Sequence, residues 1–75
     1  QIGRMAVSLE YRRRGIGGSL LRFLESQAKY QGTKRILLHA QTYVVTFYIR
    51  HGYQQEGMPF QEAGIEHILM RKALI

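Results

Sequence analysis

Apolar residues recur at helical spacing between Gly15 and Gly32, while polar residues fill the opposite face. Glu25 and Lys29 stand in the i, i+4 order that stabilises an exposed helix face. Gly32 is well suited to the position just after a helix. The pattern therefore predicts an amphipathic helix. Its predicted core stripe comprises Ile16, Leu20, Leu24 and Ala28, with Leu21 beside it.

Two short segments on either side of this helix have the composition of strands. Residues 2–8 alternate loosely between apolar and polar positions, and residues 35–40 form an apolar block of the kind that parallel sheets bury. A strand, a helix and a strand at this spacing make a βαβ unit, whose crossover is almost always right-handed. The helix N-terminus then lies at the carboxyl end of the first strand, where open α/β sheets bind ligands.

The segment 43–51 has strand-like propensity but helix-like flanks. Thr42 is a suitable N-cap, the basic residues Arg50 and His51 suit a last turn, and Gly52 suits the position beyond it. We therefore predict a helix here.

Two further strands are predicted after this helix, at residues 53–56 and 65–72, separated by a loop that holds Gly57, Pro59 and Gly64. The expected fold class is α/β. It consists of a mixed β-sheet with a βαβ unit followed by a helix and two more strands, in the order β-α-β-α-β-β.

Composition narrows the class of protein. The chain has 75 residues and no cysteine, so a single domain or half-domain over residues 1–75 is expected, with no disulfide framework. It begins at Gln1 with residues that already read as a strand, which suggests a fragment. No membrane-length apolar run or signal peptide is visible, so a soluble, cytoplasmic protein is expected. The net charge of +6 favours polyanionic partners in general.

A basic, glycine-rich turn opens into the first helix, over residues 11–19. The first amides of a helix have no intrahelical acceptor and carry partial positive charge, so an anion binds there readily. Glycines let the backbone approach such a ligand closely, and arginine side chains add forked donors. A phosphate-binding turn is favoured over a merely solvated charge cluster.

The six residues from Arg12 to Gly17 match the arginine or glutamine, two residues, glycine, one residue, glycine or alanine signature of the GNAT superfamily of acetyl-coenzyme A dependent N-acetyltransferases. The downstream run Phe47 to Tyr53 resembles that superfamily's helix with an aromatic-tyrosine pair, ending in glycine and an aromatic residue. Residues 39–41 and 57–70 look like its ElaA-like branch. The resemblance implies the second half of an acyl-CoA N-acyltransferase fold.

The resemblance also implies roles for particular residues. Backbone amides of the glycine turn would hold the pyrophosphate, and pantetheine would run along the first strand. Two positions depart from the family pattern, since Arg13 replaces a common glycine and Gln41 a common asparagine. The implied acetyl-coenzyme A contacts are Met5, Ala6, Val7, Arg12, Arg13, Arg14, Gly15, Ile16, Gly17, Gly18, Ser19, Gln41 and Phe47.

Tyr48 corresponds to the family tyrosine taken as the general acid that protonates the coenzyme A thiolate. An ordinary phenol has a pKa of about 10 and so carries a proton to donate at neutral pH. The alternative is a buried tyrosine whose hydroxyl only satisfies a backbone group.

The general base cannot be identified from the sequence. Glu10, Glu62 and His67 are candidates in principle, although Glu10 also reads as a loop residue and His67 as a structural histidine. The spacings of His39, His51 and His67 fit no zinc motif, so no metal is predicted.

Two other functions stay open at this point. One is a noncatalytic, basic nucleic-acid-binding module, although no reader motif is present. The other is an assembly unit, in which the first strand presents an unpaired edge and the chain forms a homodimer or strand-swapped pair. No membrane partner is expected, and the amine acceptor of the enzyme reading is unknown.

Overall fold

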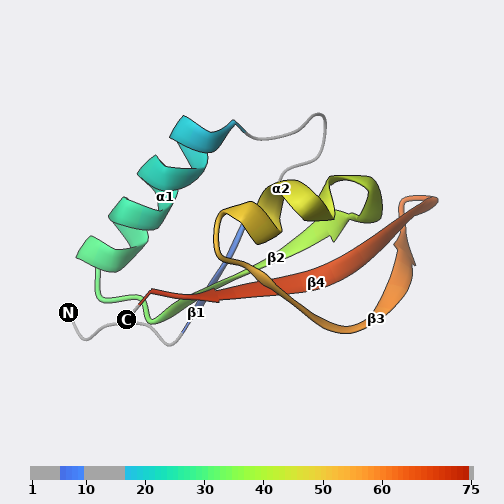
Figure 1. Cartoon of the computed structure of the whole chain (residues 1–75). Helices are drawn as coiled ribbons and strands as arrows, with labels where there is room; N and C mark the ends of the chain where they lie inside the picture. The colour runs from blue at the N-terminus through green and yellow to red at the C-terminus, as the bar shows by residue number, and fades with distance from the viewer. Residues whose placement is uncertain (1–5, 10–16, 75) are drawn as a thin grey trace.

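The computed structural model describes residues 6–9 and 17–74, with side chains described from Gly17 onward. The elements in chain order are strand β1 (Ala6–Leu9), helix α1 (Gly18–Tyr30), strand β2 (Arg35–Gln41), a 3-10 turn (Thr42–Val44), helix α2 (Val45–Arg50), and strands β3 (Gln54–Glu62) and β4 (Ile65–Ala73) (Figure 1). The predicted order β-α-β-α-β-β is confirmed.

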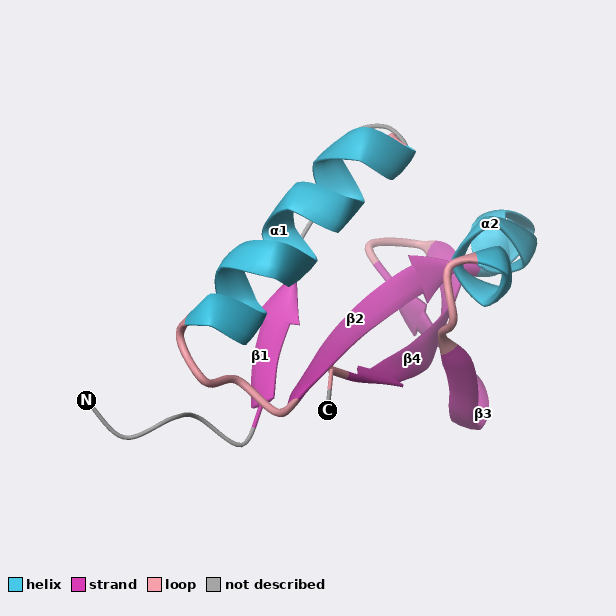
Figure 2. Cartoon of the chain, turned by 60° about the vertical axis from the view of Figure 1, so that its left-hand side comes forward, coloured by secondary structure: helices cyan, strands magenta, loops and turns pink. Residues whose placement is uncertain are grey.

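The strands form one mixed four-stranded sheet in the order β1-β2-β4-β3 (Figure 2). β1 runs parallel to β2, with Ala6 opposite Arg35 and Leu9 opposite Leu38. β4 is antiparallel to both β2 and β3, so the two C-terminal strands form a hairpin against the βαβ unit. Within the described strands β1 is an edge, and its pairing with another chain stays a prediction.

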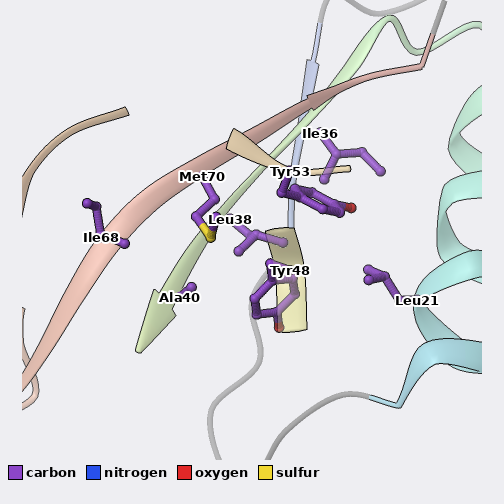
Figure 3. Close-up of a cluster of buried hydrophobic side chains, with 8 residues drawn as sticks. All are labelled: Leu21, Ile36, Leu38, Ala40, Tyr48, Tyr53, Ile68 and Met70. Atoms are coloured by element: carbon purple, nitrogen blue, oxygen red, sulfur yellow. The ribbon is translucent and has the colours of Figure 1, made fainter. Parts of the chain in front are cut away.

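The hydrophobic core lies on one face of the sheet. Burial alternates along β2, because successive side chains of a strand point to opposite faces. Helices α1 and α2 both cover the buried face, and Figure 3 shows Leu21 of α1 pointing toward the cluster in which Tyr48 of α2 lies. The buried cluster comprises Leu21, Ile36, Leu38, Ala40, Tyr48, Tyr53, Ile68 and Met70.

The buried face of α1 differs from the predicted stripe. Leu21 is completely buried, whereas Leu20 is 47% exposed, so the prediction of Leu20 as core was wrong. Adjacent helical residues point about 100° apart, and α1 turns Leu21 toward the sheet. Leu24 and Ala28 do pack against the cluster, in agreement with the stripe. Ile16 lies outside the described residues.

Glu25 belongs to this buried face as well. The sequence pattern placed it on the exposed face beside Lys29, but only 9% of Glu25 is exposed. Its carboxylate bonds instead with residues far away in the chain, which helical spacing alone does not reveal. The prediction of an exposed Glu25 was therefore wrong.

Strand β3 is longer than predicted, because it continues through the expected loop. Gly57 and Pro59 lie inside it, where the register with β4 shifts between Glu56 and Phe60. Among the strands that the structure describes, β3 pairs with β4 alone. Proline is tolerated on an edge strand and at a bulge, since its missing N–H breaks no ladder there, and Gly57 supplies a φ of +81°.

Both helices end as predicted, at glycines with positive φ. Gly32 (φ +87°) follows α1, and Gly52 (φ +93°) follows α2. The start of α2 differs, because Thr42 is not its N-cap. The Thr42 hydroxyl instead donates a hydrogen bond to Glu66 Oε1 at 3.0 Å, which ties the turn after β2 to β4. Among the helices described, neither is long and apolar enough to cross a membrane.

Candidate functional site

The predicted site residues that the structure describes fall in four places, one of which is Gln41 at the end of β2. Ala6 and Val7 lie in β1, where they are register partners of Arg35 and Ile36. Gly17, Gly18 and Ser19 form the start of α1, and Phe47 and Tyr48 lie in α2. The remaining turn and strand residues lie outside the described residues, together with the candidate base Glu10, so their roles stay predictions: Met5, Arg12, Arg13, Arg14, Gly15 and Ile16.

Among the described residues, no side chain caps the N-terminus of α1. Gly17 is its N-cap, with φ −76° and ψ 158°, and as a glycine it has no side chain that could form a capping hydrogen bond. The first turn contains no acidic residue. The helix begins with the amide of Leu21 donating to the Gly17 carbonyl at 2.9 Å. The amides before Leu21 have no intrahelical acceptor, and the helix dipole favours a negative group beside them.

The side chain of His51, the residue after α2, reaches this N-terminus. A Cβ atom on Gly18 would stand 3.3 Å from Cε1 of His51, so glycine leaves room for the His51 ring. The His51 ring in turn contacts Phe47, with ring centroids 4.7 Å apart. A Cβ on Gly17 would meet nothing within 4 Å, which leaves this position open. The structure thus places Gly18 beside the residue that follows the aromatic helix.

Tyr48 is held by aromatic neighbours and is only 7% exposed. Its ring meets Phe47 edge-on at 5.1 Å and Tyr53 edge-on at 5.6 Å between centroids. Such edge-to-face pairs fix ring orientation beyond simple burial. The turn that ends α2 closes at Tyr48, because the Tyr53 amide donates a hydrogen bond to the Tyr48 carbonyl at 3.0 Å. The short helix α2 and the turn that follows it together orient the Tyr48 side chain.

A buried polar network includes Tyr53, whose ring contacts Tyr48. The Tyr53 hydroxyl donates to Glu25 Oε2 at 2.7 Å, and Lys72 Nζ donates to Glu25 Oε1 at 3.0 Å. Burial raises the pKa of Tyr53 well above its ordinary value, and the hydrogen bond to the Glu25 carboxylate raises it further. The network joins α1, β4 and the residue just before β3, and local sequence patterns give no sign of it.

Gln41 ends β2 on the other side of the sheet. Its neighbour Ala40 faces the core, so Gln41 points to the opposite face, where its register partner is His67 of β4. The structure therefore does not bring the Gln41 and Tyr48 side chains together on one face. The two side chains lie on opposite faces of the sheet.

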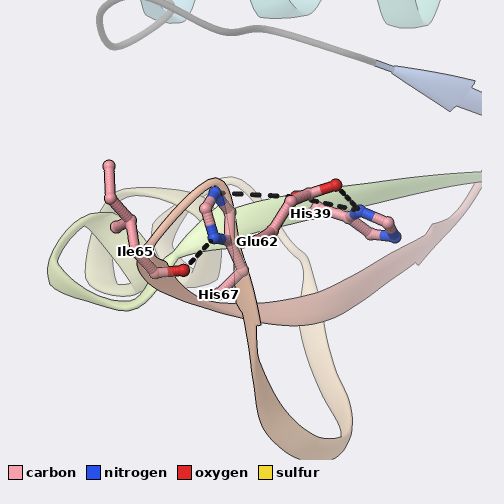
Figure 4. A network of polar contacts seen from close by, with 4 residues as sticks. All are labelled: His39, Glu62, Ile65 and His67. Atoms are coloured by element: carbon pink, nitrogen blue, oxygen red, sulfur yellow. Dashed lines mark hydrogen bonds and ion pairs between the residues drawn. The ribbon is translucent and has the colours of Figure 1, made fainter.

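A second cluster lies on this open face of the sheet (Figure 4). His39 Nδ1 lies 3.3 Å from each Glu62 carboxylate oxygen, and His67 Nε2 lies 3.7 Å from Glu62 Oε1. Two candidate bases, Glu62 and His67, are thus neighbours. Sequence reasoning missed His39, because only the register of β2, β4 and β3 brings it beside Glu62, 23 residues away. Among the described residues no group of three His, Cys, Asp or Glu could hold a metal ion.

Comparison with known proteins identifies relatives of the whole chain. The model of the Acetyltransferase (GNAT) domain matches residues 1–74. The uncharacterised N-acetyltransferase YjcF of Bacillus subtilis is 37% identical over 73 residues, covering 96% of this chain and 52% of YjcF. The chain therefore spans about half the length of the curated relatives it matches.

Two crystal structures share the fold. A candidate N-acetyltransferase from Lactobacillus plantarum matches with a TM-score of 0.75 and 31% identity, over 87% of this chain and 44% of that one. An acyl-CoA N-acyltransferase from Pseudomonas aeruginosa matches with a TM-score of 0.68 and 29% identity, over 95% and 51%. The α/β fold is thus the partial acyl-CoA N-acyltransferase fold that the sequence predicted. Because the family model matches residues 1–74, the chain belongs to the GNAT acetyltransferase family.

Proposed function

We propose that this chain forms the acetyl-coenzyme A binding part of an N-acetyltransferase that passes the acetyl group directly to an amine. The single observation that carries the proposal is the close approach of Gly18, at the N-terminus of α1, to the side chain of His51, the residue that ends the helix bearing Tyr48. The helix N-terminus proposed to bind the pyrophosphate and the helix that bears the proposed acid would thus belong to one site.

The amides at Gly17, Gly18 and Ser19 bind the pyrophosphate, and the preceding residues Arg12, Arg13, Arg14, Gly15 and Ile16 complete the turn. Pantetheine extends beside β1 at Met5, Ala6 and Val7, with Gln41 and Phe47 flanking its path. The absence of an acidic residue in the first turn of α1 supports this assignment, because a carboxylate there would repel phosphate.

Acetyl transfer needs a held thioester, a neutral amine and a proton for the leaving thiolate. The amine nitrogen attacks the acetyl carbonyl carbon, the carbon–sulfur bond breaks, and the hydroxyl of Tyr48 protonates the sulfur. The burial of Tyr48 among aromatic rings supports this role, because the ring is held in one orientation. A held acid contributes on the order of 10²–10⁴ in rate.

Replacing Gly17 with valine is expected to weaken acetyl-coenzyme A binding by about tenfold or more, or about 1.4 kcal/mol. The backbone of Gly17 is in the extended region, which valine accepts, and its added Cβ has open space, so the clash arises only with a bound pyrophosphate. Isothermal titration calorimetry with acetyl-coenzyme A measures the affinity.

The matched control is Gln27→Val, at an exposed position of the same helix. It adds a valine to the same helix but lies away from the turn, so it should keep the affinity. A parent protein that does not bind acetyl-coenzyme A at high micromolar concentration would refute the proposed function. Equal affinity of Gly17→Val and the parent would refute the assignment of the pyrophosphate to this turn.

A further inference from the structure

Helix α2, which carries Tyr48, is short and depends on neighbouring elements for its orientation. It spans six residues, fewer than two turns, and isolated helices of that length are unstable in water. The Tyr48 ring contacts Phe47, which belongs to α2 and moves with it. It also meets Tyr53 edge-on, at 5.6 Å between centroids, and Tyr53 lies outside the helix. Tyr53 therefore links the Tyr48 ring to the rest of the fold.

Tyr53 is fixed through both its backbone and its side chain. Its amide donates to the Tyr48 carbonyl at 3.0 Å and closes the turn after α2. Its hydroxyl donates to Glu25 Oε2 of α1 at 2.7 Å, and Tyr53 is only 2% exposed. Glu25 accepts a second hydrogen bond from Lys72 Nζ at 3.0 Å, so the carboxylate is held as well. Tyr53 thus connects α1 to the residue proposed as the acid.

This connection joins the two helices that the proposed function uses. Helix α1 begins at the glycines proposed to bind the pyrophosphate, and Glu25 lies about two turns further along it. Helix α2 carries Tyr48. A misplacement of about 1 Å at a reacting group can cost on the order of 10²-fold in rate, so the spacing of the two helices affects protonation of the thiolate. The hydrogen bond between Tyr53 and Glu25 spans this spacing directly.

Tyr53 has the protonation state that this role requires. Burial raises the pKa of its hydroxyl well above the ordinary value, and the hydrogen bond to Glu25, the charge of Glu25 and the neighbouring Tyr48 raise it further. The hydroxyl therefore keeps its proton at neutral pH, also while Tyr48 carries the negative charge that proton donation leaves. Tyr53 acts as a hydrogen-bond donor, and the transfer of a proton to sulfur is left to Tyr48.

We propose that Tyr53 is a positioning residue of the acetyl transfer, which holds the Tyr48 ring in place relative to α1 through its hydrogen bond to Glu25. This inference rests on the proposed function. When the carbon–sulfur bond breaks, the Tyr48 proton goes to the departing sulfur, and Tyr53 itself gives up no proton. Its contribution is to kcat, because the orientation of Tyr48 affects the chemical step and not the affinity for the donor.

The test measures release of the coenzyme A thiol by the protein that carries this chain. The acceptor is hydroxylamine, which is largely uncharged at neutral pH, and the rate without protein is subtracted. We expect Tyr53→Phe to lower kcat by about tenfold and to leave the KM for acetyl-coenzyme A within about threefold. In a protein that already carries Tyr48→Phe, the same change should alter kcat by less than about threefold, because Tyr53 acts through the Tyr48 hydroxyl. Losses that multiply in the double variant would overturn the proposal.

Lys72→Met is the control for lost stability. It removes the other hydrogen bond of the same Glu25 carboxylate, and the methionine stem still covers Gly52, so the loss of stability should resemble that of Tyr53→Phe. The hydrogen bond between Tyr53 and Glu25 remains, so kcat should stay within about threefold of the wild type. Kinetics are measured at a temperature at which circular dichroism shows every variant folded. Equal losses of kcat in Lys72→Met and Tyr53→Phe would leave Tyr53 a stabilising role alone and overturn the assignment.

Substitutions at Glu25 give a second, independent readout. Glutamine keeps a carbonyl oxygen that accepts the hydrogen bond of the Tyr53 hydroxyl, whereas leucine does not. We expect Glu25→Gln to keep kcat within about threefold and Glu25→Leu to lower it by about tenfold. Equal kcat in these two variants would contradict the role of the hydrogen bond. Wild-type protein that binds acetyl-coenzyme A but releases no thiol above the subtracted rate would also overturn the proposal, whereas failure to bind acetyl-coenzyme A would overturn the proposed function.

Discussion

Replacing Tyr48 with phenylalanine is expected to lower kcat by on the order of 10²–10⁴, with little change in acetyl-coenzyme A affinity. The ring of phenylalanine keeps the edge contacts to Phe47 and Tyr53, so the core around position 48 remains filled. The substitution removes the proposed proton donor to the thiolate. Steady-state kinetics with a neutral acceptor, combined with calorimetry of acetyl-coenzyme A binding, separates turnover from affinity.

Tyr43→Phe is the control for this substitution. Tyr43 precedes α2 and is 77% exposed, so its hydroxyl can be removed without disturbing the core. Its kcat should stay close to that of the wild type. A Tyr48→Phe protein that loses turnover and cofactor affinity to the same extent would assign Tyr48 a packing role.

Tyr53→Phe is expected to destabilise the fold by about 1.5–3 kcal/mol, the usual range for a hydrogen bond to a charged group. The Tyr53 hydroxyl donates to the buried Glu25 carboxylate, which would keep Lys72 as its remaining partner. Chemical denaturation at neutral pH measures the free energy of unfolding. Tyr30→Phe, which is 90% exposed, is the control and should change it by less than about 0.5 kcal/mol.

The same residue predicts a pH dependence at the alkaline end. The pKa of Tyr53 is raised in the folded state by burial and by Glu25, so the folded protein holds this proton more tightly than the unfolded chain. The resulting stability is fully present below the ordinary phenol pKa of about 10 and is lost as pH rises beyond it. Thermal melts from pH 8 to 11 should therefore show a steeper alkaline decline for wild type than for Tyr53→Phe. Parallel declines would contradict a buried, proton-holding Tyr53.

The two helix ends were predictable from sequence for a local reason. Gly32 and Gly52 occupy positive φ values that other residues resist, so their position in the chain marks where each helix stops. Local sequence also predicted that Thr42 caps α2, and this was wrong, because the Thr42 hydroxyl donates instead to Glu66 of β4. Proline and glycine likewise suggested a loop at residues 57–59, whereas an edge strand with a bulge accommodates both.

The amphipathic pattern predicted α1 but not which of its sides is buried. Leu20 and Leu21 are equally apolar, and the sheet selects Leu21. Glu25 shows the stronger limit, since a carboxylate four residues before Lys29 reads as a surface pair. Its actual partners, Tyr53 and Lys72, lie 28 and 47 residues away.

Residue order alone determined the succession of strands and helices, the glycine turn ahead of α1 and the family resemblance of the Phe47–Tyr53 segment, because each depends on backbone propensities and short-range spacing. Tertiary structure decided which side chains meet. It placed Gly18 against His51, buried Glu25 under Tyr53, and brought His39 beside Glu62 through the pairing of β2, β4 and β3. Contacts of this kind depend on strand register and helix rotation, which many distant residues set together.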